Sequence, residues 1–101
     1  MSYPKFILTD TGQIRLGMVN MHKDLLKPGE SCRGGGFYEF DYAGSRIILS
    51  RRSYDFGRPR WYHFDELLVP KVYEGLRLIY RDDDGEETDL GSVFKISYVD
   101  D

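Results

Sequence analysis

Residues 38–50 read YEFDYAGSRIILS, and this stretch decides the fold class. Aromatic side chains at positions 38, 40 and 42 alternate with carboxylates at 39 and 41. Because successive side chains of a strand point to opposite faces, this alternation predicts a strand with one buried and one solvated face. Residues 46–50 are rich in β-branched side chains and predict a second strand. Ala43-Gly44-Ser45 supplies the turn between them, so the stretch predicts an antiparallel hairpin.

Two further hairpins are predicted, one on each side of the first. Asp10-Thr11-Gly12 provides the turn of the N-terminal hairpin. Asp84-Gly85 ends the turn of the C-terminal hairpin, and this dipeptide is among the strongest short hairpin signals. The strands of these hairpins and one final strand are predicted at 5–9, 13–19, 76–81, 86–90 and 93–99. Helical patterns extend over single turns only, near 22–26, 65–68 and 70–74.

The fold expected from these patterns is mainly β, with at most short helical turns. A length of 101 residues suits one domain, so residues 1–101 are expected to form a single small barrel or sandwich built from sequential antiparallel hairpins. The hydrophobic fraction of 41% is too high for a disordered chain. No apolar run approaches the ~20 residues of a membrane span or the ~7 of a signal peptide. With its one cysteine, the chain is expected to be soluble and cytoplasmic, without a disulfide framework.

The charges are divided unevenly along the chain. Residues 1–63 hold ten Lys/Arg and six Asp/Glu, whereas residues 64–101 hold four Lys/Arg and eleven Asp/Glu. Such a division is compatible with a basic binding surface followed by an acidic tail. We favour the alternative, in which the two halves interleave in one fold and mix their charges on its surface.

The sequence lacks most of the common catalytic and metal-binding patterns. The acidic turn at 82–85 is no EF-hand, because Tyr80 stands at the first ligand position and Gly91 where the final Glu is required. His22 and His63 are too far apart in sequence to form a paired metal site, and no cofactor pattern is found. Cys32 with one of these histidines leaves a small hydrolase as one alternative.

Residues 51–63 combine arginines with aromatic side chains and form the strongest candidate for a partner surface. The candidate partner-binding residues are Arg51, Arg52, Tyr54, Arg58, Arg60 and Trp61. We expect a non-catalytic binding or protein-interaction module with a protein or peptide partner, and an unpaired sheet edge offers strand addition as the mechanism. A single-stranded nucleic-acid or glycan binder is a second alternative, although the pI of about 5.3 disfavours nucleic acid. The same arginines and rings are also compatible with a core and its solvated rim.

Two segments, 20–36 and 60–65, have local patterns that predict their conformation. Residues 20–36, with Gly34-Gly35-Gly36, are expected to form a long mobile loop that adds to the partner surface. Residues 60–65 are treated as a strand, in which Trp61 and Phe64 lie on opposite faces. The face that carries Tyr62 and Phe64 is the more apolar one. Phe64 is therefore expected to be buried and Trp61 at least partly exposed.

Overall fold

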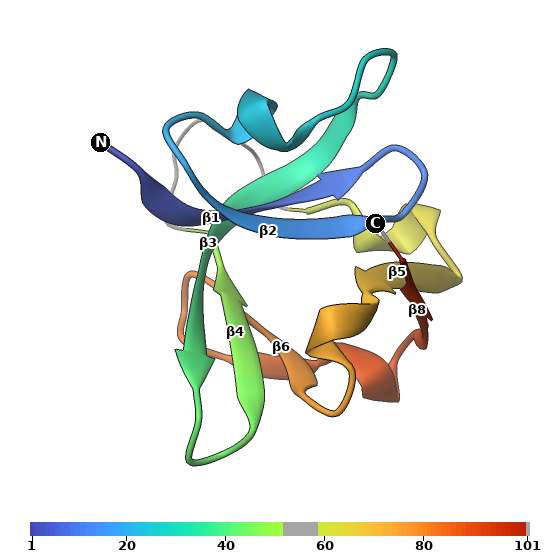
Figure 1. The fold of residues 1–101 in the computed structure, drawn as a ribbon. Helices are drawn as coiled ribbons and strands as arrows, with labels where there is room; N and C mark the ends of the chain where they lie inside the picture. The colour runs from blue at the N-terminus through green and yellow to red at the C-terminus, as the bar shows by residue number, and fades with distance from the viewer. Residues whose placement is uncertain (52–58, 101) are drawn as a thin grey trace.

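The computed structural model describes residues 1–51 and 59–100. Within them the chain forms eight strands and four short 3₁₀ turns (Figure 1). The strands are β1 (Tyr3–Thr9), β2 (Ile14–Val19), β3 (Cys32–Asp41), β4 (Arg46–Ser50), β5 (Glu66–Pro70), β6 (Arg77–Arg81), β7 (Glu87–Asp89) and β8 (Lys95–Val99). The turns are η1 (His22–Leu25), η2 (Trp61–His63), η3 (Lys71–Tyr73) and η4 (Leu90–Ser92). The prediction of a mainly β fold with only short helical turns is confirmed.

The strands form two sheets. One has six strands in the order β2-β1-β3-β4-β6-β7, and the other contains β5 and β8. The three predicted hairpins are present as the antiparallel pairs β1–β2, β3–β4 and β6–β7. Two further pairs, β4–β6 and β5–β8, are parallel. Parallel neighbours need a crossover connection, which local hairpin signals do not reveal. Within residues 1–51 and 59–100 the larger sheet remains open and does not close into a barrel.

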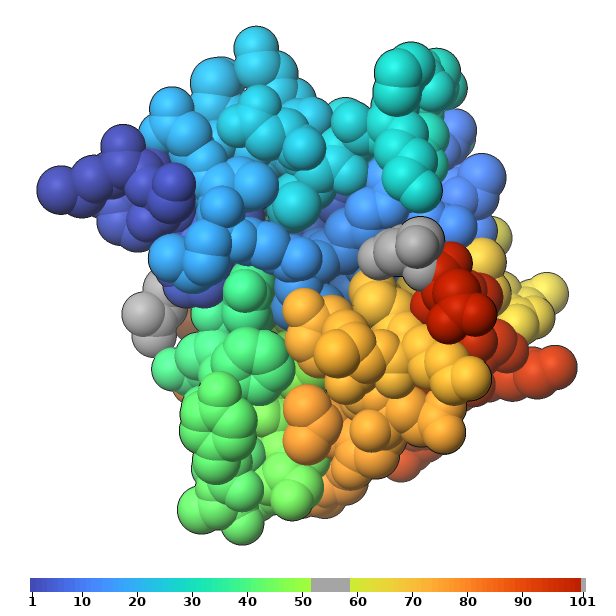
Figure 2. All heavy atoms as spheres, viewed as in Figure 1, coloured from blue at the N-terminus to red at the C-terminus, as the bar shows by residue number. Residues whose placement is uncertain are grey.

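The hydrophobic core lies between one face of the large sheet and the strand β5. Phe6, Leu8 and Ile14 come from the N-terminal hairpin, and all three are fully buried. Further core residues come from the later strands, namely Ile47, Leu49, Leu67, Val69, Leu78 and Tyr80. In the space-filling view the blue and cyan N-terminal segments lie above the green and orange-red parts of the chain (Figure 2).

The other face of the large sheet carries ion pairs that cross from strand to strand. Arg81 Nη1 reaches Glu39 on β3 at 3.2 Å, although β4 lies between β6 and β3. The pair runs diagonally across β4, because Glu39 is the register partner of Ile48, which is only 4% exposed, and Arg81 is the register partner of Ser50. Arg46 reaches Glu87 on β7 in the same way, at 3.0 Å. Charged groups from residues 1–63 and 64–101 therefore mix on one surface.

The three consecutive glycines lie inside the sheet, so the prediction of one long loop over residues 20–36 is wrong. All three are buried, and they pair with Phe6, Ile7 and Leu8 of β1. A Cβ on Gly36 would lie 2.1 Å from the carbonyl oxygen of Ser50, which is much closer than atoms can approach. The glycine at this position is therefore required by the close packing of β3 against the end of β4.

Residues 20–31 connect β2 to β3 and are held against β2. The buried Arg15 guanidinium pairs with both carboxylate oxygens of Glu30 and donates to the carbonyl oxygen of Leu25 at 2.9 Å. This hydrogen bonding holds the pKa of Glu30 at about 2, well below its usual value. The segment is thus fixed by a charged anchor that is not visible in its own composition.

Candidate functional site

The predicted partner surface at residues 51–63 is only partly described by the structure. Three of its candidate residues, Arg52, Tyr54 and Arg58, lie outside the described residues. Arg51 Nη1 forms an ion pair with Asp83 Oδ2 at 3.0 Å. Arg60 is exposed, and its main-chain N–H donates to the carbonyl oxygen of Arg33. Arg51 is thus engaged with the acidic turn between β6 and β7.

Trp61 packs against the core, and residues 60–65 do not form the predicted strand. Residues 61–63 form the 3₁₀ turn η2, in which side chains three residues apart lie on the same side. Trp61 and Phe64 therefore both contact the core cluster, and both are partly exposed. The Trp61 ring lies edge-on to Tyr80, with centroids 5.6 Å apart. The expectation of a partly exposed Trp61 is confirmed, whereas the burial of Phe64 and the opposite faces are wrong.

The Cys32 thiol shows no sign of activation. Its Sγ donates to the carbonyl oxygen of Gly34 at 2.9 Å, and burial raises the pKa of the thiol. A nucleophilic cysteine needs the opposite shift. His22 is buried, with Nε2 on the carbonyl oxygen of Gly36 at 2.9 Å, and His63 is exposed on η2. In residues 1–51 and 59–100 no group of three or more His, Cys, Asp or Glu side chains is placed to hold a metal ion. No helix in the same part of the chain is long and apolar enough to cross a membrane.

The edges of the two sheets differ in how far they are covered. β7 is three residues long and carries Glu87 and Asp89, features that discourage pairing with another strand. β2 is approached by β5 through a bridge between Gln13 and Leu68. By contrast, β5 is the only strand of the described chain that pairs with β8. The two strands lie side by side at the right of Figure 1.

The register of β8 shows which of its main-chain groups face outward. The N–H of Lys95 donates to the carbonyl oxygen of Asp65 beside β5 at 3.4 Å. Because successive residues of a strand turn their N–H and C=O groups to opposite sides, Ser97 and Val99 also face β5. The N–H and C=O groups of Ile96 and Tyr98 therefore point away from β5.

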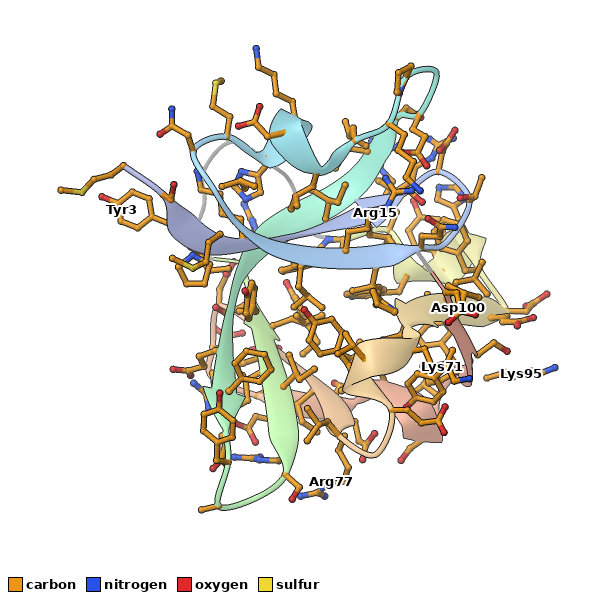
Figure 3. All side chains as sticks on the ribbon, in the orientation of Figure 1. Tyr3, Arg15, Lys71, Arg77, Lys95 and Asp100 are labelled. Carbon is orange, nitrogen blue, oxygen red and sulfur yellow. The ribbon has the colours of Figure 1, made fainter. Side chains whose placement is uncertain are left out.

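β8 borders a cleft of about 420 Å³ between β6 and the segment from η4 to β8. Its lining residues are Leu76, Arg77, Leu78, Asp89, Gly91, Phe94, Lys95, Ile96 and Tyr98. The aromatic and aliphatic lining is partly exposed at Leu76, Phe94 and Tyr98. Arg77 and Lys95 are exposed at the rim, and Figure 3 shows their side chains extending away from the ribbon. The cleft thus combines an open strand edge with apolar contact surface and two cations.

A second groove of about 420 Å³ lies where β1 and β3 diverge. It is lined by Tyr3, Pro4, Phe37, Tyr38, Glu39 and Ser50. β1 pairs with β3 only as far as Phe37, so among the described strands the rest of β3 has β4 alone as its neighbour. Glu39 at this groove is already paired with Arg81. The β8 cleft combines a strand that is paired on one side only along its whole length with cations that form no ion pair to any described residue, and we take it as the candidate site.

Comparison of the chain with protein-family models, with curated proteins and with solved structures finds no match. The candidate site therefore rests on geometry alone. Sequence reasoning placed the partner surface at 51–63 and 20–36 and missed the cleft between 76 and 98. The alternation of Phe94, Ile96 and Tyr98 was visible as a strand with one apolar face. Its open edge depends on which strands become its neighbours, and the sequence carries no local signal for that.

Proposed function

We propose that this protein is a non-catalytic binding module that takes up an extended segment of a protein partner along the outer edge of β8. The observation that carries the proposal is the outward direction of the N–H and C=O groups of Ile96 and Tyr98 beside an open cleft. Strand addition uses such groups for affinity and the neighbouring side-chain contacts for specificity. The proposal includes a cytoplasmic location, which the lone cysteine supports.

The four outward main-chain groups set the scale of the interaction. At roughly 0.5–1.5 kcal/mol net for each hydrogen bond, they contribute about 2–6 kcal/mol, before the cost of association is subtracted. Apolar burial must supply the rest of the affinity. Leu76, Phe94 and Tyr98 offer partly exposed apolar surface for alternate side chains of the added segment. The expected complex is therefore of moderate affinity and short lifetime.

The two alternative functions have less support. The nucleic-acid and glycan alternative rests on segment 51–63, where Arg51 is paired with Asp83 and Trp61 packs on the core. The hydrolase alternative rests on Cys32, and the pKa of its thiol is raised. Neither arrangement favours these functions over binding at the β8 edge.

The test uses peptides selected for binding from a random eight-residue library and resynthesised with single N-methylated amides. N-methylation removes one main-chain donor and leaves the side chains in place. In strand addition, methylation at every second position abolishes binding, and methylation at the intervening positions is tolerated. Amide chemical-shift changes are expected at residues 95–99. Uniform tolerance of N-methylation, or amide shift changes confined to residues 3 and 37–39, would overturn the proposal.

A further inference from the structure

We propose that the segment bound along β8 is acidic, with carboxylates that contact Arg77 and Lys95. This inference rests on the proposed function and adds the chemical class of the partner to it. The partner is a separate protein that presents an extended stretch in which acidic and apolar side chains alternate.

The first observation is where the cations of the acidic half lie. Residues 64–101 contain four Lys/Arg against eleven Asp/Glu. Arg81 is bound to Glu39 and Glu87 on the large sheet. Arg77 and Lys95 line the cleft, and Lys71 lies on η3, which contacts β8. Two of the four cations in this half therefore line the cleft, and a third lies on an element that contacts β8.

The second observation is that none of these three cations has an ion-pair partner among the described residues, although Arg77 is close enough to Asp41 to lower the pKa of that carboxyl. Arg46, Arg51 and Arg81 each form an ion pair with a carboxylate. Lys71, Arg77 and Lys95 are exposed, and none of them forms an ion pair with the described residues. A carboxylate of a partner would give these cations the kind of ion pair that Arg46, Arg51 and Arg81 form elsewhere on the surface.

The carboxylates close to the cleft do not occupy these cations. Asp89 Oδ1 accepts from the main-chain N–H of Gly91 at 3.0 Å. Glu66 is the register partner of Lys95 on β5, yet the two form no ion pair. Asp41 lies near Arg77 but pairs with Arg46 at 2.8 Å. The cleft therefore offers the exposed side chains of Arg77 and Lys95 to an incoming strand, beside the single carboxylate of Asp89.

An acidic peptide fits the cleft better than a single-stranded nucleic acid. Outward N–H and C=O groups on Ile96 and Tyr98 match the main chain of a peptide, which alternates donors and acceptors at the same spacing. Nucleic-acid grooves instead rely on aromatic rings that stack on successive bases. In the cleft the rings are Phe94 and Tyr98, and both also pack on the core cluster.

The experiment measures fluorescence anisotropy with three labelled eight-residue peptides that alternate Val with Glu, Gln or Lys. The Glu peptide is expected to bind about tenfold more tightly than the Gln peptide at low salt, and the difference should shrink in 0.5 M salt. Lys95→Gln and Arg77→Gln are each expected to weaken the Glu peptide about two- to fivefold and to leave the Gln peptide unchanged. Lys23→Gln, at an exposed position on η1, is the matched control and should change neither affinity.

The outcomes separate this inference from the proposed function. Equal binding of the Glu and Gln peptides, with shift changes at β8, would overturn the acidic partner and leave strand addition standing. Failure of all three peptides and of the library to bind would overturn both proposals. If a mixed single-stranded oligonucleotide binds more tightly than the Glu peptide, and this binding is lost in Lys95→Gln, the cleft is a nucleic-acid site instead. A concentration-dependent dimer that Lys95→Gln and Arg77→Gln abolish would place a second copy of the chain in the cleft and would also contradict a separate partner.

Discussion

Replacing Gly36 by alanine should destabilise the protein more than the same change at Gly17 or Gly34, two other glycines of the sheet. The new Cβ would lie 2.1 Å from the Ser50 carbonyl oxygen and 2.9 Å from Cε1 of Phe6. Ordinary contact begins near 3.4 Å, so the two strands must move apart by more than 1 Å. That movement disturbs the Phe37–Ser50 end of the β3–β4 pair as well as the packing of the fully buried Phe6.

The expected loss of stability combines two contributions. Overpacking of a close-packed site costs about 1–3 kcal/mol, and loss of one or two main-chain hydrogen bonds adds about 1–2 kcal/mol. The sum of roughly 2–5 kcal/mol is a large part of the ~5–15 kcal/mol that holds a domain of this size together.

Urea unfolding, followed through Trp61 fluorescence, measures this difference. Gly91→Ala is the control, because the nearest atom to its Cβ is a side-chain oxygen of Asp89 at 3.3 Å. It should change the free energy of unfolding by no more than about 0.5 kcal/mol. A loss below about 1 kcal/mol in Gly36→Ala would refute the close approach of β3 and β4 on which the reasoning depends.

Three further predictions concern the charged anchor, the tryptophan and the cysteine. The pKa of Glu30 is lowered to about 2, so its ion pair with Arg15 stabilises the fold fully above pH 4.5, and this stabilisation is lost as the pH falls toward 2. Urea unfolding at several pH values should show this loss in the original protein and not in Glu30→Gln. Trp61→Ala should lower the free energy of unfolding by about 2–3 kcal/mol, which is less than for a fully buried Trp, because the ring contacts Tyr80 yet remains partly exposed. Equilibrium unfolding followed by circular dichroism measures this loss. Alkylation of Cys32 by iodoacetamide at pH 8 should be slower than that of a free cysteine because burial raises the pKa of the thiol; rapid alkylation would revive the hydrolase alternative.

The local part of the fold was predictable because hairpins are encoded by nearby residues. The alternation at 38–42 and the turn residues at 10–12, 43–45 and 82–85 led to the three hairpins that the structure contains. The parallel pairs β4–β6 and β5–β8 join strands that are distant in sequence. Their partners are chosen by burial of the core as a whole, and periodicity reports only which face of a strand is apolar.

The errors share one physical cause, which is that tertiary contacts overrode local preference. Three glycines in a row favour a flexible segment, but the close approach of Ser50 to Gly36 admits no side chain there. Residues 60–65 alternate as in a strand, yet a 3₁₀ turn brings Trp61 and Phe64 to the same side of the chain. The candidate site was missed for the same reason, because an open edge on β8 is a property of the assembled sheets.

Amide hydrogen exchange of residues 95–99, with and without a saturating concentration of the Glu peptide, tests most directly whether the outer edge of β8 is unpaired and takes up an added strand. In the free protein the amides of Ile96 and Tyr98 should exchange rapidly, whereas the Ser97 amide, which faces β5, should be protected. Peptide should slow exchange at Ile96 and Tyr98 and leave Ser97 little changed. Protection of Ile96 and Tyr98 already in the free protein, or exchange that saturating peptide does not slow, would contradict strand addition at this edge.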